Sequence, residues 1–220
     1  EATVRLLAAK ARDDGYEAIA VCFLFGYLNP SNELRARDVI LEEWPEAIVS
    51  ISGEVAPEWR EYERTSSTVM DAYISPVIRR YLDRFESRMR AAGVAAPLNV
   101  MQSNGGIMSA RRAAGVPLQT LMSGPVGGTI AGESLASSLG RDQLICVDMG
   151  GTSFDVSLVV EGRAKIVSEA HIEGLPMLIP VVDLHTVGAG GGSIARAVAG
   201  GVRVGPESAG SAPGPASYGR

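Results

Sequence analysis

Apolar and polar positions in the first quarter of the chain predict a strand–helix–strand unit. Residues 18–27 and 47–55 form apolar runs rich in strand-forming side chains, as expected for strands buried on both faces. Between them, residues 29–44 carry apolar side chains at helical spacing, and Ser31 or Asn32 would cap this helix. This alternation favours an α/β fold.

Helical spacing also occurs before and after this unit. The pattern predicts a helix over 1–13, a long helix over 65–92 and a helix of small residues over 127–140. Pro76 would kink or restart the long helix. Residues 96–109 have the pattern of a strand that ends in the polar turn Gln102-Ser103-Asn104-Gly105-Gly106, which suits either a substrate amide or a plain turn.

The second half of the chain predicts strands joined by tight turns. Residues 143–149 and 153–160 would pair as strands, and Glu161-Gly162 would turn the chain into a third strand over 164–172. From residue 185 onward glycine dominates, and "SIARAVAG" is predicted to be a helix capped by Ser193. We expect a first domain over 1–122 and a second over 123–220.

Composition narrows the function without identifying it. The chain has 220 residues, 46% hydrophobic residues and a net charge of -5, which gives no support for binding nucleic acid. No apolar run is long enough for a membrane span. Cys22 and Cys146 lie in apolar runs and are expected to be buried, reduced thiols of a cytoplasmic protein. Both ends of the chain suggest a fragment of a longer polypeptide.

The stretch "ICVDMGGTSFDVSLV" at 145–159 carries the strongest chemical signal. Asp148 ends an apolar strand, two glycines follow, and Asp155 lies just beyond on the next strand. Glycines let backbone amides approach an anion, and carboxylates can join a phosphate through a divalent cation. The stretch therefore suits a Mg²⁺-nucleotide phosphate site. An ordinary hairpin with two solvated aspartates remains the alternative.

Several motifs in order resemble one family. "VDMGGTSFDVSLV" looks like the second phosphate-binding hairpin of the actin/Hsp70/sugar-kinase superfamily, and "SGPVGGTIAGESLASSLG" resembles the helix that precedes it there. Together with "SNGGIMS", "DLHTVGAGGGSIA" and "GSAPGPASYGR", these motifs are similar to the hydantoinase A/5-oxoprolinase family. The resemblance implies an α/β fold of incomplete actin/Hsp70-like (ribonuclease H-like) lobes. One of the two phosphate hairpins of such folds has no counterpart here, so the 220-residue chain alone is not expected to bind ATP tightly or turn over.

The resemblance also implies an activity. The family couples ATP hydrolysis to the opening of a cyclic amide such as a hydantoin or 5-oxoproline, with Mg²⁺ or another divalent metal. A second, hydantoinase B-type subunit is the implied partner, with neither nucleic acid nor membrane involved. Two alternatives stay open: the ATP-binding subunit of an acetone or acetophenone carboxylase-type enzyme, and a non-catalytic nucleotide-binding lobe.

The resemblance assigns roles to residues of the hairpin and of a second glycine-rich loop. Asp148 would hold the metal, and Asp155 would bind the metal or orient water; which aspartate takes which role stays open. The residues implied to contact phosphate or ribose are Gly150, Gly151, Thr152, Ser153, Gly188, Gly190, Gly191 and Gly192.

Asp183 and His185 form a further candidate pair. On a strand, residues two positions apart point to the same face, so the two could hold a metal or act as an acid–base couple. We therefore name His185 with the two aspartates as catalytic and Asp183 as a third metal ligand. A histidine simply satisfied by its neighbouring carboxylate is the competing interpretation.

Overall fold

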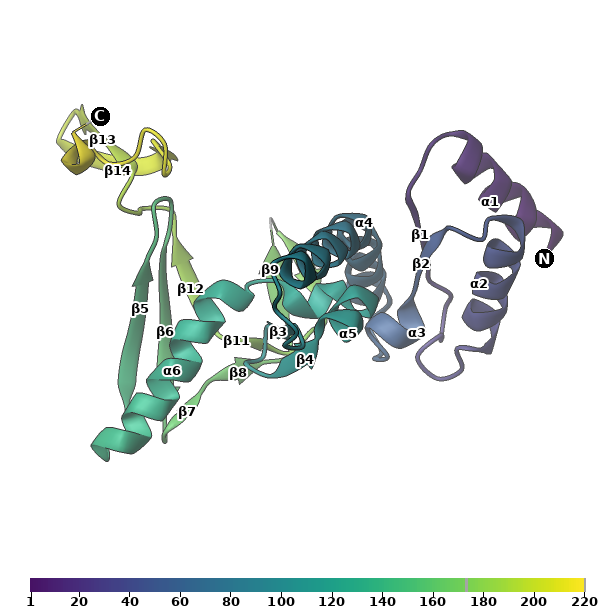
Figure 1. Ribbon diagram of the computed structural model, residues 1–220, viewed down its shortest axis with the longest axis horizontal. Helices are drawn as coiled ribbons and strands as arrows, with labels where there is room; N and C mark the ends of the chain where they lie inside the picture. The colour runs from purple at the N-terminus through teal and green to yellow at the C-terminus, as the bar shows by residue number, and fades with distance from the viewer. Residues whose placement is uncertain (173, 220) are drawn as a thin grey trace. The chain divides into compact units, whose positions relative to one another are not determined.

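The computed structural model of the chain describes residues 1–172 and 174–219 and shows a mixed α/β protein (Figure 1). It consists of two compact units. The first comprises Glu1–Leu121 and Ser168–Val181, and the second comprises Met122–Val167 and the chain from Val182 onward. The junction after Leu121 lies beside the predicted division between residues 122 and 123. The sequence pattern gave no sign that Ser168–Val181 joins the first unit.

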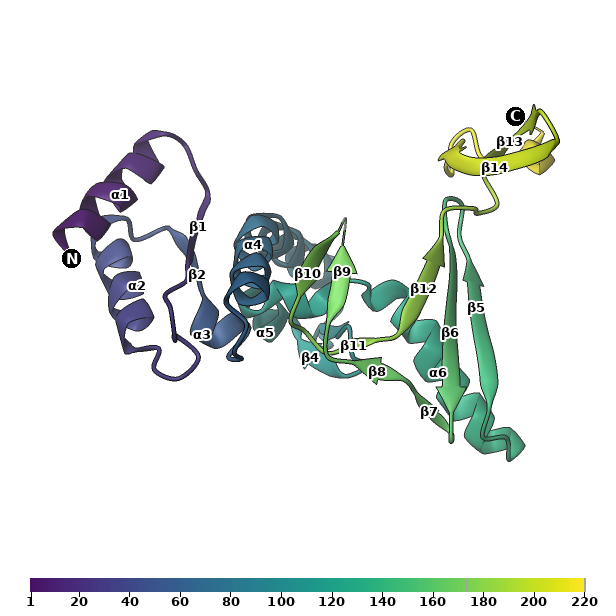
Figure 2. The ribbon, with the colours of Figure 1, turned by 180° about the vertical axis from the view of Figure 1, so that it is seen from behind.

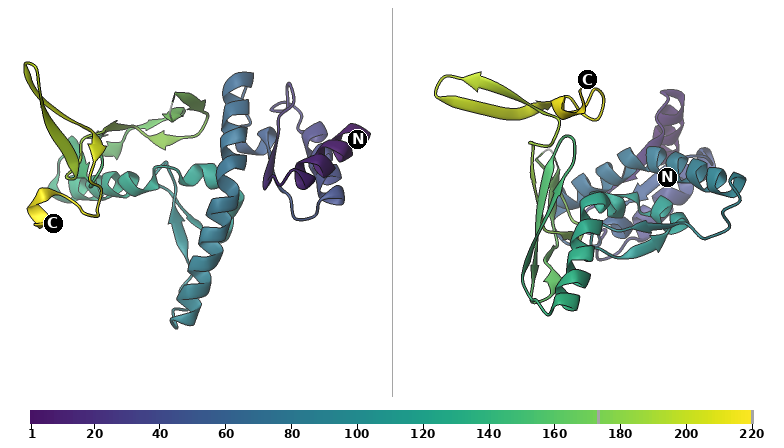
Figure 3. Two further views of the ribbon diagram at one scale, coloured as in Figure 1. Left: turned by 90° about the horizontal axis from the view of Figure 1, so that it is seen from above. Right: turned by 60° about the vertical axis from the view of Figure 1, so that its left-hand side comes forward.

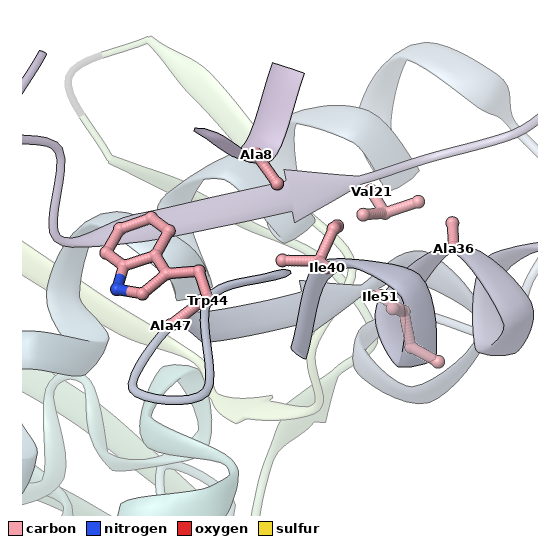
Figure 4. Packing of buried hydrophobic residues seen from close by; sticks show 7 residues of the cluster. All are labelled: Ala8, Val21, Ala36, Ile40, Trp44, Ala47 and Ile51. Atoms are coloured by element: carbon pink, nitrogen blue, oxygen red, sulfur yellow. The ribbon is translucent and has the colours of Figure 1, made fainter. Parts of the chain in front are cut away.

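The first unit begins with the predicted strand–helix–strand motif. The elements are α1 (Ala2–Asp13), β1 (Ala18–Val21), α2 (Ser31–Glu43) and β2 (Ile48–Ile51). β1 and β2 pair in parallel, which requires a crossover connection, and α2 supplies it. Both helices pack with the strands around one apolar cluster (Figure 4), made of Ala8, Val21, Ala36, Ile40, Trp44, Ala47 and Ile51.

Both strands are shorter than predicted because buried polar side chains form hydrogen bonds with the backbone just beyond each strand. After β1, the Phe23 amide donates to Glu33 Oε1 at 2.8 Å and the Phe23 carbonyl accepts from Arg64 Nη2 at 2.7 Å. After β2, the Gly53 amide donates to Glu33 Oε2 at 2.7 Å, and residues Ser52–Val55 form the short helix α3 instead of more strand. Glu33 and Arg64 are both fully buried.

The predicted cap of α2 is wrong. The helix begins at Ser31 after Pro30, and no side chain caps it. Asn29 instead accepts a hydrogen bond from the Ser31 amide through its side-chain oxygen. Proline fits a helix start because its φ is already close to helical.

The rest of the first unit is arranged around one long helix. α4 (Glu61–Ala91) begins four residues before the predicted start and contains Pro76 without ending there (Figure 3). The other elements of the unit are β3 (Asn99–Met101), β4 (Ile107–Ser109), α5 (Ala110–Gly115), the short 3-10 helix η1 (Pro117–Thr120), β9 (Ala170–Ile172) and β10 (Leu175–Met177). β3 and β4 form a hairpin around the predicted polar turn, and β10 packs on α4.

The second unit contains the predicted glycine hairpin. α6 (Ser123–Leu139) precedes β5 (Leu144–Met149) and β6 (Phe154–Val160), and both strands run antiparallel as expected. β12 (Leu184–Val187) lies on the other side of β6, so the sheet order is β12-β6-β5 (Figure 2). The remaining elements are β7 (Arg163–Ala164), β8 (Ile166–Val167), β13 (Ser193–Val198), β14 (Gly201–Ser208) and the 3-10 helix η2 (Ala216–Tyr218). β11 (Val181–Val182) has one residue in each unit.

Two predictions in this region are wrong. The expected third strand over 164–172 is broken into β7, β8 and β9. The expected helix from Ser193 is the strand β13, which pairs antiparallel with β14 across a turn at Gly200 with φ of 90°. A glycine turn between alternating segments is a hairpin signal, and here it outweighs the helical spacing.

Among the described residues, no helix combines the length and the apolar character that crossing a bilayer requires.

Candidate functional site

The register of the β5–β6 pair places the two predicted aspartates opposite each other. Asp148 pairs with Asp155, Cys146 with Ser157, and Leu144 with Val159. Directly opposed residues of an antiparallel pair project from the same face of the sheet. Both carboxylates therefore leave the hairpin on one side.

Helix α6 covers that face of the sheet. Thr129 Oγ1 lies 2.6 Å from Ser157 Oγ, and both side chains are buried. A Cβ atom added to Gly132 would lie 2.4 Å from Cys146 Sγ, so only a glycine lets the helix come this close without a shift. In contrast, Ile145 and Val147, which project from the other face, are 72% and 61% exposed.

A small pocket separates the start of α6 from the two aspartates. It has a volume of about 50 Å³, enough for a few ordered waters or an ion. Its walls are formed by Pro125, Gly128, Thr129, Cys146, Val147, Asp148, Asp155, Ser157 and Leu184. The first turns of a helix carry positive partial charge, which favours nearby anionic groups.

The two carboxylates differ in their partners. Thr186 Oγ1 donates to Asp155 Oδ1 at 2.5 Å, and Ser153 Oγ donates to Asp155 Oδ2 at 3.3 Å. Both hydroxyls hold the Asp155 carboxylate in one orientation. Asp148 accepts no hydrogen bond from any residue that the structure describes, so both of its oxygens can bind a ligand or water.

The turn between the strands presents consecutive backbone amides. The Gly150 amide closes the turn by donating to the Ser153 carbonyl at 2.9 Å. Within residues 1–172 and 174–219, the amides of Gly151, Thr152 and Ser153 have no hydrogen-bond acceptor. Successive amides of a turn that lack a protein acceptor can donate to an anion.

The structure brings the second predicted glycine loop onto this turn. The Gly191 amide donates to the Gly150 carbonyl at 2.9 Å, and the Gly192 amide donates to the Gly151 carbonyl at 2.7 Å. A Cβ atom added to Gly190 would lie 2.7 Å from the backbone of Thr152. The loop thus packs against the turn and holds it through two backbone hydrogen bonds.

These bonds change the predicted role of the second loop. The Gly190 amide donates to Ser193 Oγ at 2.8 Å, so Ser193 closes a turn and caps no helix. The amides of Gly190, Gly191 and Gly192 are all occupied by protein acceptors. These three amides are therefore not free to donate to a ligand in this structure. Gly188 has no neighbouring atom within 4 Å of an added Cβ.

Asp183 and His185 lie away from the paired aspartates. His185 pairs with Val156 in the β12–β6 register, so it projects from the face opposite to Asp148 and Asp155. Asp183 precedes β12 and binds Lys165 Nζ through Oδ2 at 2.8 Å. In the described part of the chain, no three His, Cys, Asp or Glu side chains are grouped for metal binding.

Three residues of the site were missed from the sequence. Thr129, Ser157 and Thr186 project toward the same side as the two aspartates. Strand alternation could have identified Ser157, two residues after Asp155. Thr129 and Thr186 needed the packing of α6 and β12 against the hairpin.

Comparison with known proteins gives consistent matches along the chain. A family model described as Hydantoinase/oxoprolinase matches residues 64–220, and one for the Hydantoinase/oxoprolinase N-terminal region matches residues 1–44. The chain is 38% identical to caprolactamase subunit alpha of Pseudomonas jessenii, over 100% of this chain and 32% of that protein. It is 38% identical to 5-oxoprolinase of Saccharomyces cerevisiae, over 99% of this chain and 17% of that protein.

A solved structure agrees with these matches. The nucleotide-free structure of acetone carboxylase, described under the mechanism of ATP-dependent acetone carboxylation, superimposes with a TM-score of 0.80 at 33% identity. The match covers 96% of this chain and 30% of that one. The chain therefore spans a third or less of the length of these relatives.

Proposed function

The chain belongs to the hydantoinase/oxoprolinase family, and from that premise we propose that it is part of an ATP-dependent enzyme that opens cyclic amides. One observation carries the proposal. Asp148 and Asp155 lie opposite each other beside the turn over 150–153, in which three amides have no hydrogen-bond acceptor among the described residues. The substrate class is a hydantoin, 5-oxoproline or a related lactam. Support comes from relatives named caprolactamase and 5-oxoprolinase.

ATP has a clear chemical purpose in such a reaction. Amide resonance makes the ring carbonyl a poor electrophile. Transfer of the terminal phosphoryl group to the carbonyl oxygen releases ADP and leaves a carbon that water can attack. The ring C–N bond then breaks and phosphate leaves. The protein contributes mainly positioning and neutralisation of charge.

The residues of the hairpin fit a hard divalent cation. The donor set consists of two carboxylates with nearby hydroxyls, and Mg²⁺ is typically bound by one or two carboxylates while keeping several waters. Asp148 would hold the ion, because its carboxylate accepts no hydrogen bond from the residues that the structure describes. Bound Mg²⁺ would supply charge neutralisation between the carboxylates and the phosphates.

The other groups then take complementary parts. Asp155, held by Thr186 and Ser153, would orient a water beside the ion or the substrate. The amides of Gly151, Thr152 and Ser153 donate to phosphate oxygens. The loop over 188–192 keeps this turn in shape through its bonds to Gly150 and Gly151. His185 and Asp183 receive no part in binding the metal.

The proposal extends to the fold and the partner. We assign the second unit to an actin/Hsp70-like lobe, in which a helix precedes a phosphate-binding hairpin, as α6 precedes β5 and β6 here. A second phosphate hairpin and the rest of the nucleotide pocket would come from outside this chain. A partner subunit is supported by relatives whose names call them subunits.

Ketone carboxylation is the second candidate. The match to acetone carboxylase supports it, but the crystal structure of an ATP-dependent caprolactamase matches with the same TM-score of 0.80, so fold similarity does not separate the two candidates. The same ATP site would activate a different substrate pair. The intact protein with its partner subunit separates the two candidates when release of ADP is measured with each substrate. Stimulation by a hydantoin, 5-oxoproline or a lactam, with ring opening seen by NMR, supports the amide reaction. Stimulation only by a ketone with bicarbonate supports carboxylation.

A further inference from the structure

The first unit contains a polar cavity that the proposed reaction does not use. It has a volume of about 360 Å³ and lies among β2, α3, α4 and α5. Its ionisable lining groups are Glu54, Asp71, Arg79 and Arg112. This volume is at the lower end of the range for small-molecule sites, about 300–1,000 Å³.

The acidic groups of the cavity are already satisfied by protein partners. Both carboxylate oxygens of Glu54 lie 2.9 Å from Arg37 Nη1. Asp71 accepts from Ser50 Oγ at 2.7 Å and from the Leu118 amide at 3.1 Å. Burial raises the pKa of the Asp71 carboxyl above its usual value of 3.8, although both hydrogen bonds and the charge of Arg79 oppose the rise.

The basic groups of the cavity are not satisfied in the same way. Arg79 Nε donates to the Ala114 carbonyl at 3.0 Å, which fixes the plane of its guanidinium but leaves both terminal nitrogens without a described acceptor. Arg112 belongs to α5, and its side chain is exposed. Among described residues, no carboxylate oxygen lies within 4.0 Å of either guanidinium. Both guanidinium groups thus keep free donors, although the Asp71 carboxyl is close enough for the charge of Arg79 to act on its pKa.

We propose that this cavity binds a small organic anion through its carboxylate or phosphate group, held between Arg79 and Arg112. Guanidinium groups bind planar or tetrahedral oxyanions with paired hydrogen bonds, and a fixed guanidinium loses less freedom on binding. The residues of β2, including Ser50, whose hydroxyl is engaged by Asp71, form one wall of the site. The site is separate from the glycine hairpin, which belongs to the other unit.

Calorimetric titration of the intact protein tests the proposal with two probes, inorganic phosphate and glutarate. A saturating non-hydrolysable ATP analogue with Mg²⁺ is present so that added phosphate does not bind at the glycine turn. Arg112→Ala removes one cation from the cavity. Arg111→Ala is the matched control, because Arg111 is adjacent and exposed but does not line the cavity.

We expect the wild-type protein to bind one probe saturably. In Arg112→Ala, the affinity for that probe should fall by about tenfold or more. Arg111→Ala keeps the wild-type affinity, and the preferred probe distinguishes a phosphate ligand from a carboxylate ligand. Arg79→Lys, which keeps the charge but loses the planar fork, weakens binding as well. Absence of saturable binding with both probes, or equal affinities in the Arg111 and Arg112 variants, would overturn the proposal. The comparison of the Arg111 and Arg112 variants does not require turnover of ATP, so it can fail without the proposed reaction failing.

Discussion

Asp148 lies directly opposite Asp155 across the antiparallel β5–β6 pair, and both carboxylates leave the sheet on the face covered by α6. Two like charges at adjacent positions repel each other unless a cation or solvent screens them. A divalent ion at this place removes the repulsion and links the carboxylates to a phosphate. The metal–phosphate site proposed above uses this pairing of the two carboxylates.

Asp148→Asn should lower ATP hydrolysis by the intact enzyme about 100-fold, the scale seen when a group that stabilises developing charge is removed. It should leave thermal stability within about 0.5 kcal/mol, because Asp148 has no hydrogen-bond donor among described residues. The assay is release of ADP at saturating substrate. Asp142→Asn, an exposed aspartate just before β5, serves as the control. Equal rates of ADP release by Asp148→Asn and Asp142→Asn would show that Asp148 is not part of the site.

Thr186→Val should lower kcat about tenfold, because it removes the hydroxyl that donates to Asp155 Oδ1. A hydrogen bond to a charged group contributes about 1.5–3 kcal/mol. Thr186→Ser keeps the donor and should restore most of the rate. A valine variant with the wild-type kcat would show that Thr186 does not position Asp155.

Gly190→Ala should raise the KM for ATP, because the added Cβ atom would lie 2.7 Å from the backbone of the hairpin turn and force it to move. Gly188→Ala is the matched control in the same loop, since nothing lies within 4 Å of its added Cβ. Steady-state kinetics of both variants decide the matter. An unchanged KM in Gly190→Ala, or an equal increase in Gly188→Ala, would show that the loop over 188–192 does not hold the hairpin turn in shape.

Asp71 should make the stability of the protein depend on pH. Since burial raises the folded-state pKa of this carboxyl, its contribution is greatest below about 3.8 and is lost as the pH rises through the folded-state value. Each unit of raised pKa corresponds to about 1.4 kcal/mol. The free energy of unfolding of the wild type minus that of Asp71→Asn should therefore fall with rising pH.

Chemical denaturation at a series of pH values from below 3.8 upward measures this difference in the free energy of unfolding. Asp83→Asn provides the control, because Asp83 is exposed on the same helix. A difference between wild type and Asp71→Asn that stays constant with pH, or rises with it, would contradict the effect of burial.

Alternation of apolar and polar residues was sufficient to predict the glycine hairpin, α4, α6 and the parallel β1–β2 unit. These elements depend on local periodicity and on turn residues, which the sequence shows directly. The position of Asp148 at a strand end and of Asp155 on the next strand followed from the same pattern. Their face-to-face register depends only on the length of the turn.

Other features depend on distant residues and could not be predicted in this way. β1 ends at Val21 because Glu33 and Arg64 capture the backbone of Phe23, and no local signal marks that. Glycines of the loop over 188–192 pack closely on the hairpin turn, whereas the family resemblance implied that they contact phosphate or ribose. His185 lies on the opposite face of the sheet because β12 pairs with β6 in a register that only the folded sheet defines.

The position of the nucleotide tests the central claim most directly. A structure of the intact enzyme with Mg²⁺ and a non-hydrolysable ATP analogue should place the terminal phosphates within hydrogen-bonding distance of the amides of Gly151–Ser153. It should also place the metal, or one of its waters, against Asp148. Phosphates bound elsewhere, with the hairpin turn and both aspartates facing only solvent, would contradict the account.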